Sequence, residues 1–196
     1  MLSSDNSLLV LVALGVVVFV ALLSVAWLAS TSSRRRHEHL KRRFGPEYER
    51  AIVEYGSLER AERELIAREK RVKHLRLHDL SSNERARFSG NWEAVQARFV
   101  DDPSGAVQAA HELIERVMVA RGYRLEDFDQ RIADLSVEHA AVVQHYRAAR
   151  VLADANREGR ANTEELRQAL VHYRVLFADL LAPPSHGRQQ LKEARV

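Results

Sequence analysis

The stretch WEAVQARFVDDPSGAV, residues 92–107, decides how the second half of this chain folds. Trp92 and Phe99 are about two helical turns apart, so they lie on one face of a helix. Pro103 suits the first turn of a following helix, because its missing N–H group is not needed there. Asp102 then occupies the N-cap position, where its carboxylate accepts backbone N–H groups. The stretch therefore predicts two helices joined at a capped corner.

The adjacent carboxylates of Asp101 and Asp102 could instead form an acid–base or metal site. Two neighbouring residues in a turn seldom point at one substrate atom, and no His or Lys lies close to them in the sequence. We therefore assign Asp102 and Pro103 a structural role, as the cap and first turn of the second helix.

Histidine pairs are the other candidate metal ligands. His111-Glu112 resembles the start of the HExxH zinc motif, but position 115 is Glu, so the second imidazole is missing. His74 and His78 have the i,i+4 spacing of a helical metal site, although basic residues surround them. The sequence shows no Gly-rich phosphate loop and no GxSxG elbow. We expect no catalytic, cofactor-binding or metal-binding residue, and a protein that is not an enzyme.

Apolar residues recur at helical spacing throughout residues 81–182. Gly122 is expected to end one helix, and Asn162 with Glu165 forms a capping-box pattern at the start of another. Ser136 is expected to cap a further helix. This region is predicted to form a small bundle of four or five helices.

Residues 46–76 are rich in charge and are predicted to form one long helix that begins at Pro46. Its favourable i,i+4 pairs are Glu59–Arg63, Glu64–Arg68 and Glu69–Lys73. Its apolar spacing is too irregular for a coiled-coil seam. We expect residues 46–80 to be a solvated arm, about 45 Å long if its helix is straight, followed by a hinge.

Residues 8–29, LLVLVALGVVVFVALLSVAWLA, carry no charge and match the length of a transmembrane helix. Trp27 lies near one end, where an aromatic ring favours the membrane interface. A cleaved signal peptide would begin with basic residues, whereas residues 1–7 contain only the charged residue Asp5. The sequence predicts a short N-terminal tail followed by one permanent membrane span.

The excess positive charge lies beside this apolar segment, in the linker 30–45. Its basic residues are Arg34, Arg35, Arg36, Lys41, Arg42 and Arg43. From Phe44 onward, 24 basic residues accompany 25 acidic ones, so the pI near 9.4 does not indicate a nucleic-acid-binding domain. The positive-inside rule predicts an N-terminus outside and a cytoplasmic soluble domain at the bacterial inner membrane. The basic run is also expected to contact anionic lipid head groups.

The composition indicates the fold class. The chain has no cysteine, which excludes disulfides, Cys-ligated zinc, iron–sulfur clusters and thiol catalysis. Only 8 Gly and 4 Pro among 196 residues favour helix. The predicted class is all-α, with one N-terminal transmembrane helix, a long charged helix, a helical bundle and a C-terminal tail at 183–196.

Residues 88–123 resemble a family of uncharacterised bacterial single-span membrane proteins. The resemblance depends on the pattern F-x3-W-x2-VQ-x2-FVDDP and on the later Gly-Tyr, and it extends over most of the chain after the membrane segment. The family pattern has Asp after Ala110 and Pro after the Gly-Tyr, where this chain has His111 and Arg124. The resemblance implies a helical domain behind one anchor and implies no known activity.

Together these features favour a membrane-anchored, non-enzymatic interaction or scaffold protein. We expect an accessory subunit that stabilises a larger membrane complex, with the bilayer and other subunits as partners, no nucleic acid and no cofactor. The alternative is a membrane-anchored sensor whose helical bundle binds a small ligand or a metal ion.

Overall fold

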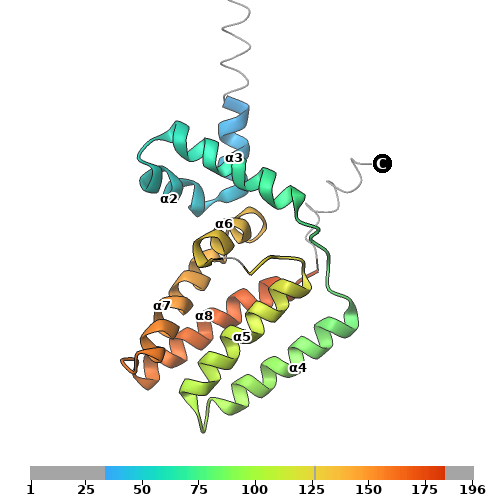
Figure 1. The fold of residues 1–196 in the computed structure, drawn as a ribbon, viewed down its shortest axis with the longest axis vertical. Coiled ribbons are helices and arrows are strands. Elements are labelled where there is room, and N and C mark those ends of the chain that lie inside the picture. The colour runs from blue at the N-terminus through green and yellow to red at the C-terminus, as the bar shows by residue number, and fades with distance from the viewer. Residues whose placement is uncertain (1–33, 126, 184–196) are drawn as a thin grey trace, which may run out of the picture. The chain divides into compact units, whose positions relative to one another are not determined.

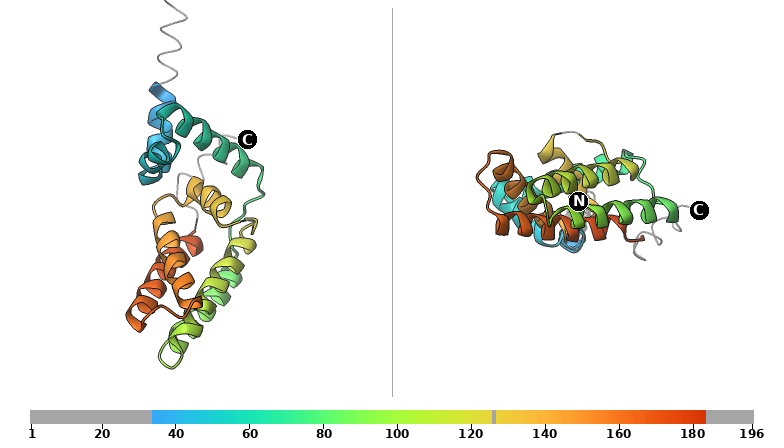
Figure 2. Two further views of the ribbon diagram at one scale, coloured as in Figure 1. Left: turned by 60° about the vertical axis from the view of Figure 1, so that its left-hand side comes forward. Right: turned by 90° about the horizontal axis from the view of Figure 1, so that it is seen from below.

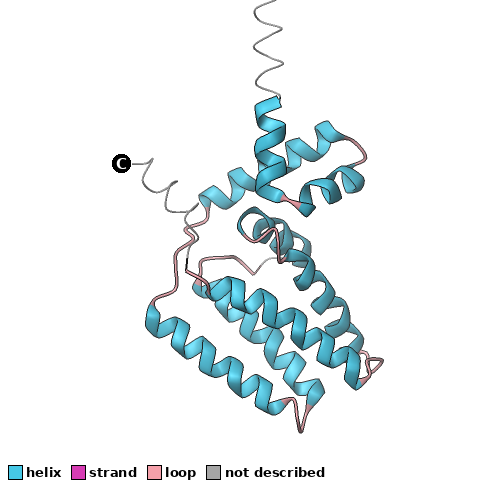
Figure 3. Cartoon of the chain, turned by 180° about the vertical axis from the view of Figure 1, so that it is seen from behind, coloured by secondary structure: helices cyan, strands magenta, loops and turns pink. Residues whose placement is uncertain are grey.

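The computed structural model describes residues 34–125 and 127–183, and all regular structure in these ranges is helical (Figure 1, Figure 3). Residues 34–44 are helical, and the helices after them are α2 (Pro46–Tyr55), α3 (Leu58–His74), α4 (Ser82–Arg98), α5 (Pro103–Ala120), α6 (Phe128–Glu138), α7 (Val143–Arg157) and α8 (Thr163–Leu181). The all-α prediction is confirmed for this part of the chain. The predicted span 8–29 lies outside the described residues, and no described helix is long and apolar enough to cross a membrane.

Helices α4 to α8 form the bundle that the periodicity predicts (Figure 1). α5 packs against α4 and α8, and α8 packs in turn against α7. Trp92 of α4 stacks on Phe177 of α8, with ring centroids 4.8 Å apart. The apolar residues of α5 that are completely buried are Ala106, Val107, Ala110, Leu113, Ile114, Val117 and Met118. The core is therefore centred on α5, the helix that begins at the Asp-Pro corner.

Local capping interactions set where several of these helices begin. The Asp102 side chain accepts a hydrogen bond from the Gly105 backbone N–H at 2.8 Å, and Pro103 occupies the first turn of α5. Asn162 and Glu165 form a reciprocal capping box at the start of α8. These contacts satisfy N–H groups that have no partner within their own helix.

Ser136 does not cap α7, contrary to the prediction from sequence. It is buried inside α6, where its hydroxyl donates to the Ala133 carbonyl oxygen at 2.7 Å. α7 begins after Val142, with no side-chain cap.

The prediction of one long helix over 46–76 is wrong, because the chain folds back at Gly56. This glycine has φ 70°, in the left-handed region that ends helices, and the Ser57 side chain then caps α3 by accepting from the Arg60 N–H. α2 and α3 pack against each other as a helical hairpin (Figure 2). Among the described residues from 43 onward, the hairpin and the bundle belong to one compact unit, so the expected solvated arm is also wrong.

The hairpin meets the bundle through charged side chains. Glu47 of α2, only 1% exposed, pairs with the Arg147 guanidinium of α7, where Nη2 donates to Oε2 at 2.9 Å. Arg71 of α3 donates to Asp134 of α6 at 2.9 Å. The buried apolar residues of the hairpin, which lie outside the main apolar cluster of the bundle, are Tyr48, Ala51, Ala61, Leu65 and Val72. The hairpin thus has buried apolar residues of its own, α3 packs against α6, and ion pairs join the hairpin to α6 and α7.

The segment between α3 and α4 crosses the C-terminal end of α5. The His78 N–H donates to the Arg121 carbonyl oxygen at 3.1 Å. The Arg121 side chain is 2% exposed; its Nη1 donates to the Leu180 carbonyl at 2.6 Å, and Asp79 lies 3.7 Å from Nη2. Gly122 follows with φ 91°, so close to the linker that a Cβ would lie 2.5 Å from the Arg76 carbonyl oxygen.

Replacing Gly122 with Ala should lower the free energy of unfolding by about 2 kcal/mol or more, because a Cβ there is strained by the backbone and collides with the linker. Gly90, inside α4 with open space around it, is the control: Gly90→Ala should stabilise by about 0.5–1 kcal/mol. Urea unfolding of the full chain in detergent, monitored by circular dichroism, measures the free energy of unfolding of both variants. A Gly122→Ala variant as stable as the parent would contradict this close approach.

Candidate functional site

The basic run predicted to face lipid lies in the helical segment 34–44. The side chains of Arg34, Arg35, Arg36, Lys41 and Arg42 are exposed. Arg43 differs, because its Nε lies 3.0 Å from a Glu69 carboxylate oxygen of α3 and its side chain is 30% exposed. Arg43 is therefore engaged with the hairpin, and the exposed positive charge comes from the five residues before it.

The two adjacent carboxylates at the corner do not form a common site. Asp102 uses one oxygen for the Gly105 N–H and the other for Arg98, whose Nη2 donates at 2.6 Å. The Arg98 hydrogen bond, followed by the backbone bond from Gly105, lowers the pKa of Asp102. Asp101 is exposed to solvent. Both oxygens of Asp102 are thus occupied by structural contacts, one as the N-cap of α5 and the other as an ion pair with Arg98.

A polar cluster that sequence reasoning missed lies between α5, α6, α7 and α8. Its members are His111, Glu115, Arg131, Tyr146, Arg150 and Tyr173. Arg131 Nη1 donates to Glu115 at 2.6 Å and to the Tyr146 hydroxyl at 2.9 Å. The Tyr173 hydroxyl lies 3.1 Å from His111 Nδ1. Burial raises the pKa of both tyrosines. Periodicity alone places Tyr146 and Tyr173 on apolar faces and does not reveal their shared polar partners.

His111 is held in its neutral form within this polar cluster. Burial lowers its pKa, against the opposing effect of Glu115. The Tyr173 hydroxyl faces Nδ1 at 3.1 Å, and Nε2 faces both the Glu115 carboxylate at 3.4 Å and the Arg150 guanidinium at 3.5 Å. Glu115 is paired with Arg131, and Arg150 with Asp154 at 3.0 Å. With its charges matched in this way, the cluster acts as an internal network that fixes four helices in register.

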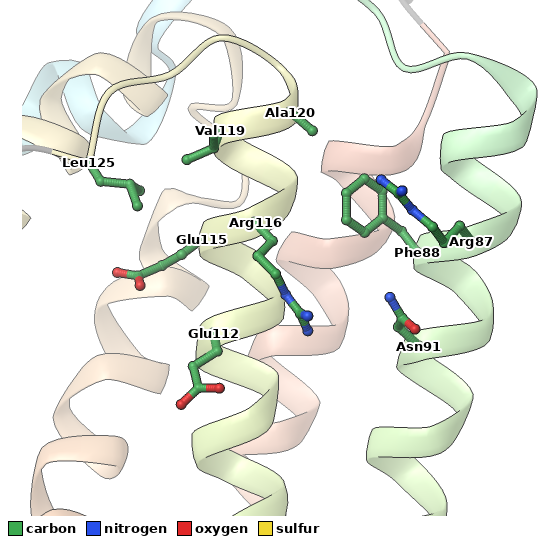
Figure 4. Close-up of a pocket in the computed structure, with 9 residues that line it drawn as sticks. All are labelled: Arg87, Phe88, Asn91, Glu112, Glu115, Arg116, Val119, Ala120 and Leu125. Atoms are coloured by element: carbon green, nitrogen blue, oxygen red, sulfur yellow. The ribbon is translucent and has the colours of Figure 1, made fainter.

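An open groove of about 740 Å³ lies between α4 and α5 (Figure 4). Arg116 points from α5 toward α4, while Glu115 points away from it. Val119 and Leu125 at the edge of the groove are 52% and 46% exposed. The residues that line it are Arg87, Phe88, Asn91, Glu112, Glu115, Arg116, Val119, Ala120 and Leu125. The groove combines apolar side chains with two positive and two negative charges.

The structure rearranges the histidine pairs expected from sequence. His74 ends α3 and His78 lies in the extended linker, so their i,i+4 spacing no longer places them on one helix face. His145 of α7 and His172 of α8 instead lie together, with their Nδ1 atoms 2.9 Å apart. Within residues 34–125 and 127–183, no group of three or more potential metal ligands is present.

Comparison with known proteins adds no identification: no family model, no curated protein and no solved structure matches this chain. The resemblance based on residues 88–123 stays a prediction.

Replacing Asp102 with Ala should lower the melting temperature near neutral pH, because the cap and the Arg98 contact are lost. The folded-state pKa of Asp102 is below its ordinary value of 3.8. Its contribution is therefore complete well above that pH and disappears as the pH falls through the lower folded-state pKa. Thermal unfolding at several pH values measures this contribution. The difference in melting temperature between Asp102→Ala and the parent should become smaller in acid.

Asp101→Ala is the matched control and should melt like the parent, because Asp101 is exposed. A loss for Asp102→Ala that stays constant down to the most acidic pH, or an equal loss for Asp101→Ala, would contradict the assigned cap.

Proposed function

We propose that this chain is a membrane-anchored, non-enzymatic interaction protein, an accessory subunit that binds and stabilises a larger complex of the bacterial inner membrane. The observation that carries the proposal is the groove between α4 and α5 (Figure 4). The apolar segment 8–29 supports the anchor, and the resemblance over residues 88–123 agrees with a single-span protein.

The groove has the chemistry of a protein-docking surface. Phe88, Val119 and Leu125 supply apolar area, of which Val119 and Leu125 are substantially exposed. The basic residues Arg87 and Arg116 share the groove with the acidic residues Glu112 and Glu115. A surface for nucleic acid or for an anionic bilayer carries one dominant charge, whereas mixed charge around apolar side chains suits a segment of another protein.

The exposed basic helix supports a location next to the membrane. Positive side chains beside a membrane span are retained in the cytoplasm, and each contributes about 1 kcal/mol of attraction when it is close to an anionic surface. The groove would then face cytoplasmic portions of a membrane complex.

The absence of cysteine allows a direct test of topology. Single substitutions Ser4→Cys and Ser89→Cys introduce one thiol before the predicted span and one on the exposed face of α4. With a membrane-impermeant maleimide, Ser4→Cys should be labelled on spheroplasts and Ser89→Cys only after lysis. The opposite pattern, or labelling of both before lysis, would refute the proposed orientation.

Site-specific photo-crosslinking tests the groove. A photoreactive amino acid at Val119, in the groove, should give a discrete adduct with a membrane protein in cells. The same residue at Val151 is the matched control, because Val151 is a 68% exposed valine on α7 away from the groove. Identical adducts from both positions would count against the proposal. So would the absence of any adduct from position 119 in a protein that purifies as a monomer without partners in mild detergent.

A further inference from the structure

Two histidines that are 27 residues apart in the sequence are brought together by the packing of α7 against α8. The Nδ1 atoms of His145 and His172 are 2.9 Å apart, and the ring centroids are 5.2 Å apart with the planes inclined at 44°. Both side chains are half-buried, so each ring is held by its helix and still reaches solvent.

The distance between the two Nδ1 atoms matches the distance between two neighbouring ligand atoms on one metal ion. Imidazole nitrogens bind first-row divalent metals at about 2.0–2.1 Å. Two such ligands in neighbouring positions of a square-planar site are about 2.9 Å apart, whereas a tetrahedral site requires about 3.3 Å. We propose that His145 and His172 form a two-histidine clip for Cu²⁺ or Ni²⁺, whose remaining coordination positions are filled by water.

The surroundings of the pair are compatible with a cation. The residues one turn away from either histidine are all uncharged: Ala141, Val142, Ala148, Ala149, Gln168, Ala169, Val175 and Leu176. The charged residues nearest in the sequence, Arg147 and Arg174, are two positions from the histidines and therefore do not share their helix face; Arg147 is paired with Glu47.

The clip would connect two helices that otherwise meet through side-chain packing. Without metal, one imidazole donates its N–H to the other, and a bound ion replaces this single hydrogen bond by two coordinate bonds. This site lies on α7 and α8, away from the proposed docking groove on α4 and α5, and it does not depend on the proposed function.

Copper titration of the full chain in detergent tests the clip, with an affinity tag that contains no histidine. Isothermal titration at pH 7.5 gives stoichiometry and affinity, and electron spin-echo envelope modulation of bound Cu²⁺ counts the imidazole ligands. The variants are His145→Asn and His172→Asn, because an asparagine amide keeps a hydrogen-bonding group near the position of Nδ1. The matched control is the double variant His74→Asn, His78→Asn, which removes the pair that has metal-site spacing only in sequence.

The parent should bind one Cu²⁺ per chain through two imidazoles. Each single variant should lower the affinity by about tenfold or more, and the double control should bind like the parent. The echo measurement on the parent does not depend on any variant folding correctly. One imidazole or none in that spectrum, unchanged affinity in either single variant, or an equal loss in the double control would overturn the proposal.

Discussion

Burial of the Arg121 guanidinium is the constraint on which the arrangement of the other elements depends. A cation that is 2% exposed requires acceptors, and it finds them in the Leu180 carbonyl at the end of α8 and in Asp79 of the linker. One side chain thereby fixes the ends of the two central bundle helices relative to the segment that enters α4. The His78 N–H bond to the Arg121 carbonyl and the tight approach at Gly122 hold that segment in place. The end of the hairpin, where α3 leads into this segment, is consequently held in a defined position.

Features set by neighbouring residues could be predicted from sequence. The Asp-Pro order at 102–103 and the Asn162–Glu165 spacing determine helix starts within one turn, and both caps are present. The buried face of α4 likewise follows from residues on successive turns, and Phe88, Trp92 and Val95 are indeed buried. In each case the energetic preference is local, so knowledge of the three-dimensional fold is not required.

Features that depend on distant residues could not be predicted in this way. A single Gly56 within a helical pattern is compatible with a continuous helix, and tertiary pairing of Glu47 with Arg147 and of Arg71 with Asp134 favours the folded-back form. Ser136 suits a cap by residue type but is inside α6. The His145–His172 pair joins residues 27 positions apart on successive helices, and the polar cluster around His111 joins α5 to α8, so neither follows from local spacing. Helical spacing instead made His74 and His78 a candidate metal-binding pair. The two residues do not share a helix face, because α3 ends at His74.

The ion-paired contact between hairpin and bundle gives the two halves of this unit different responses to their environment. Apolar burial around α5 strengthens in the presence of salts that are excluded from the protein surface. The pairs Glu47–Arg147 and Arg71–Asp134 are part-buried, and dissolved ions weaken them as soon as the contact begins to open. The contact between hairpin and bundle is therefore the part of this unit whose stability is expected to fall most as ionic strength rises.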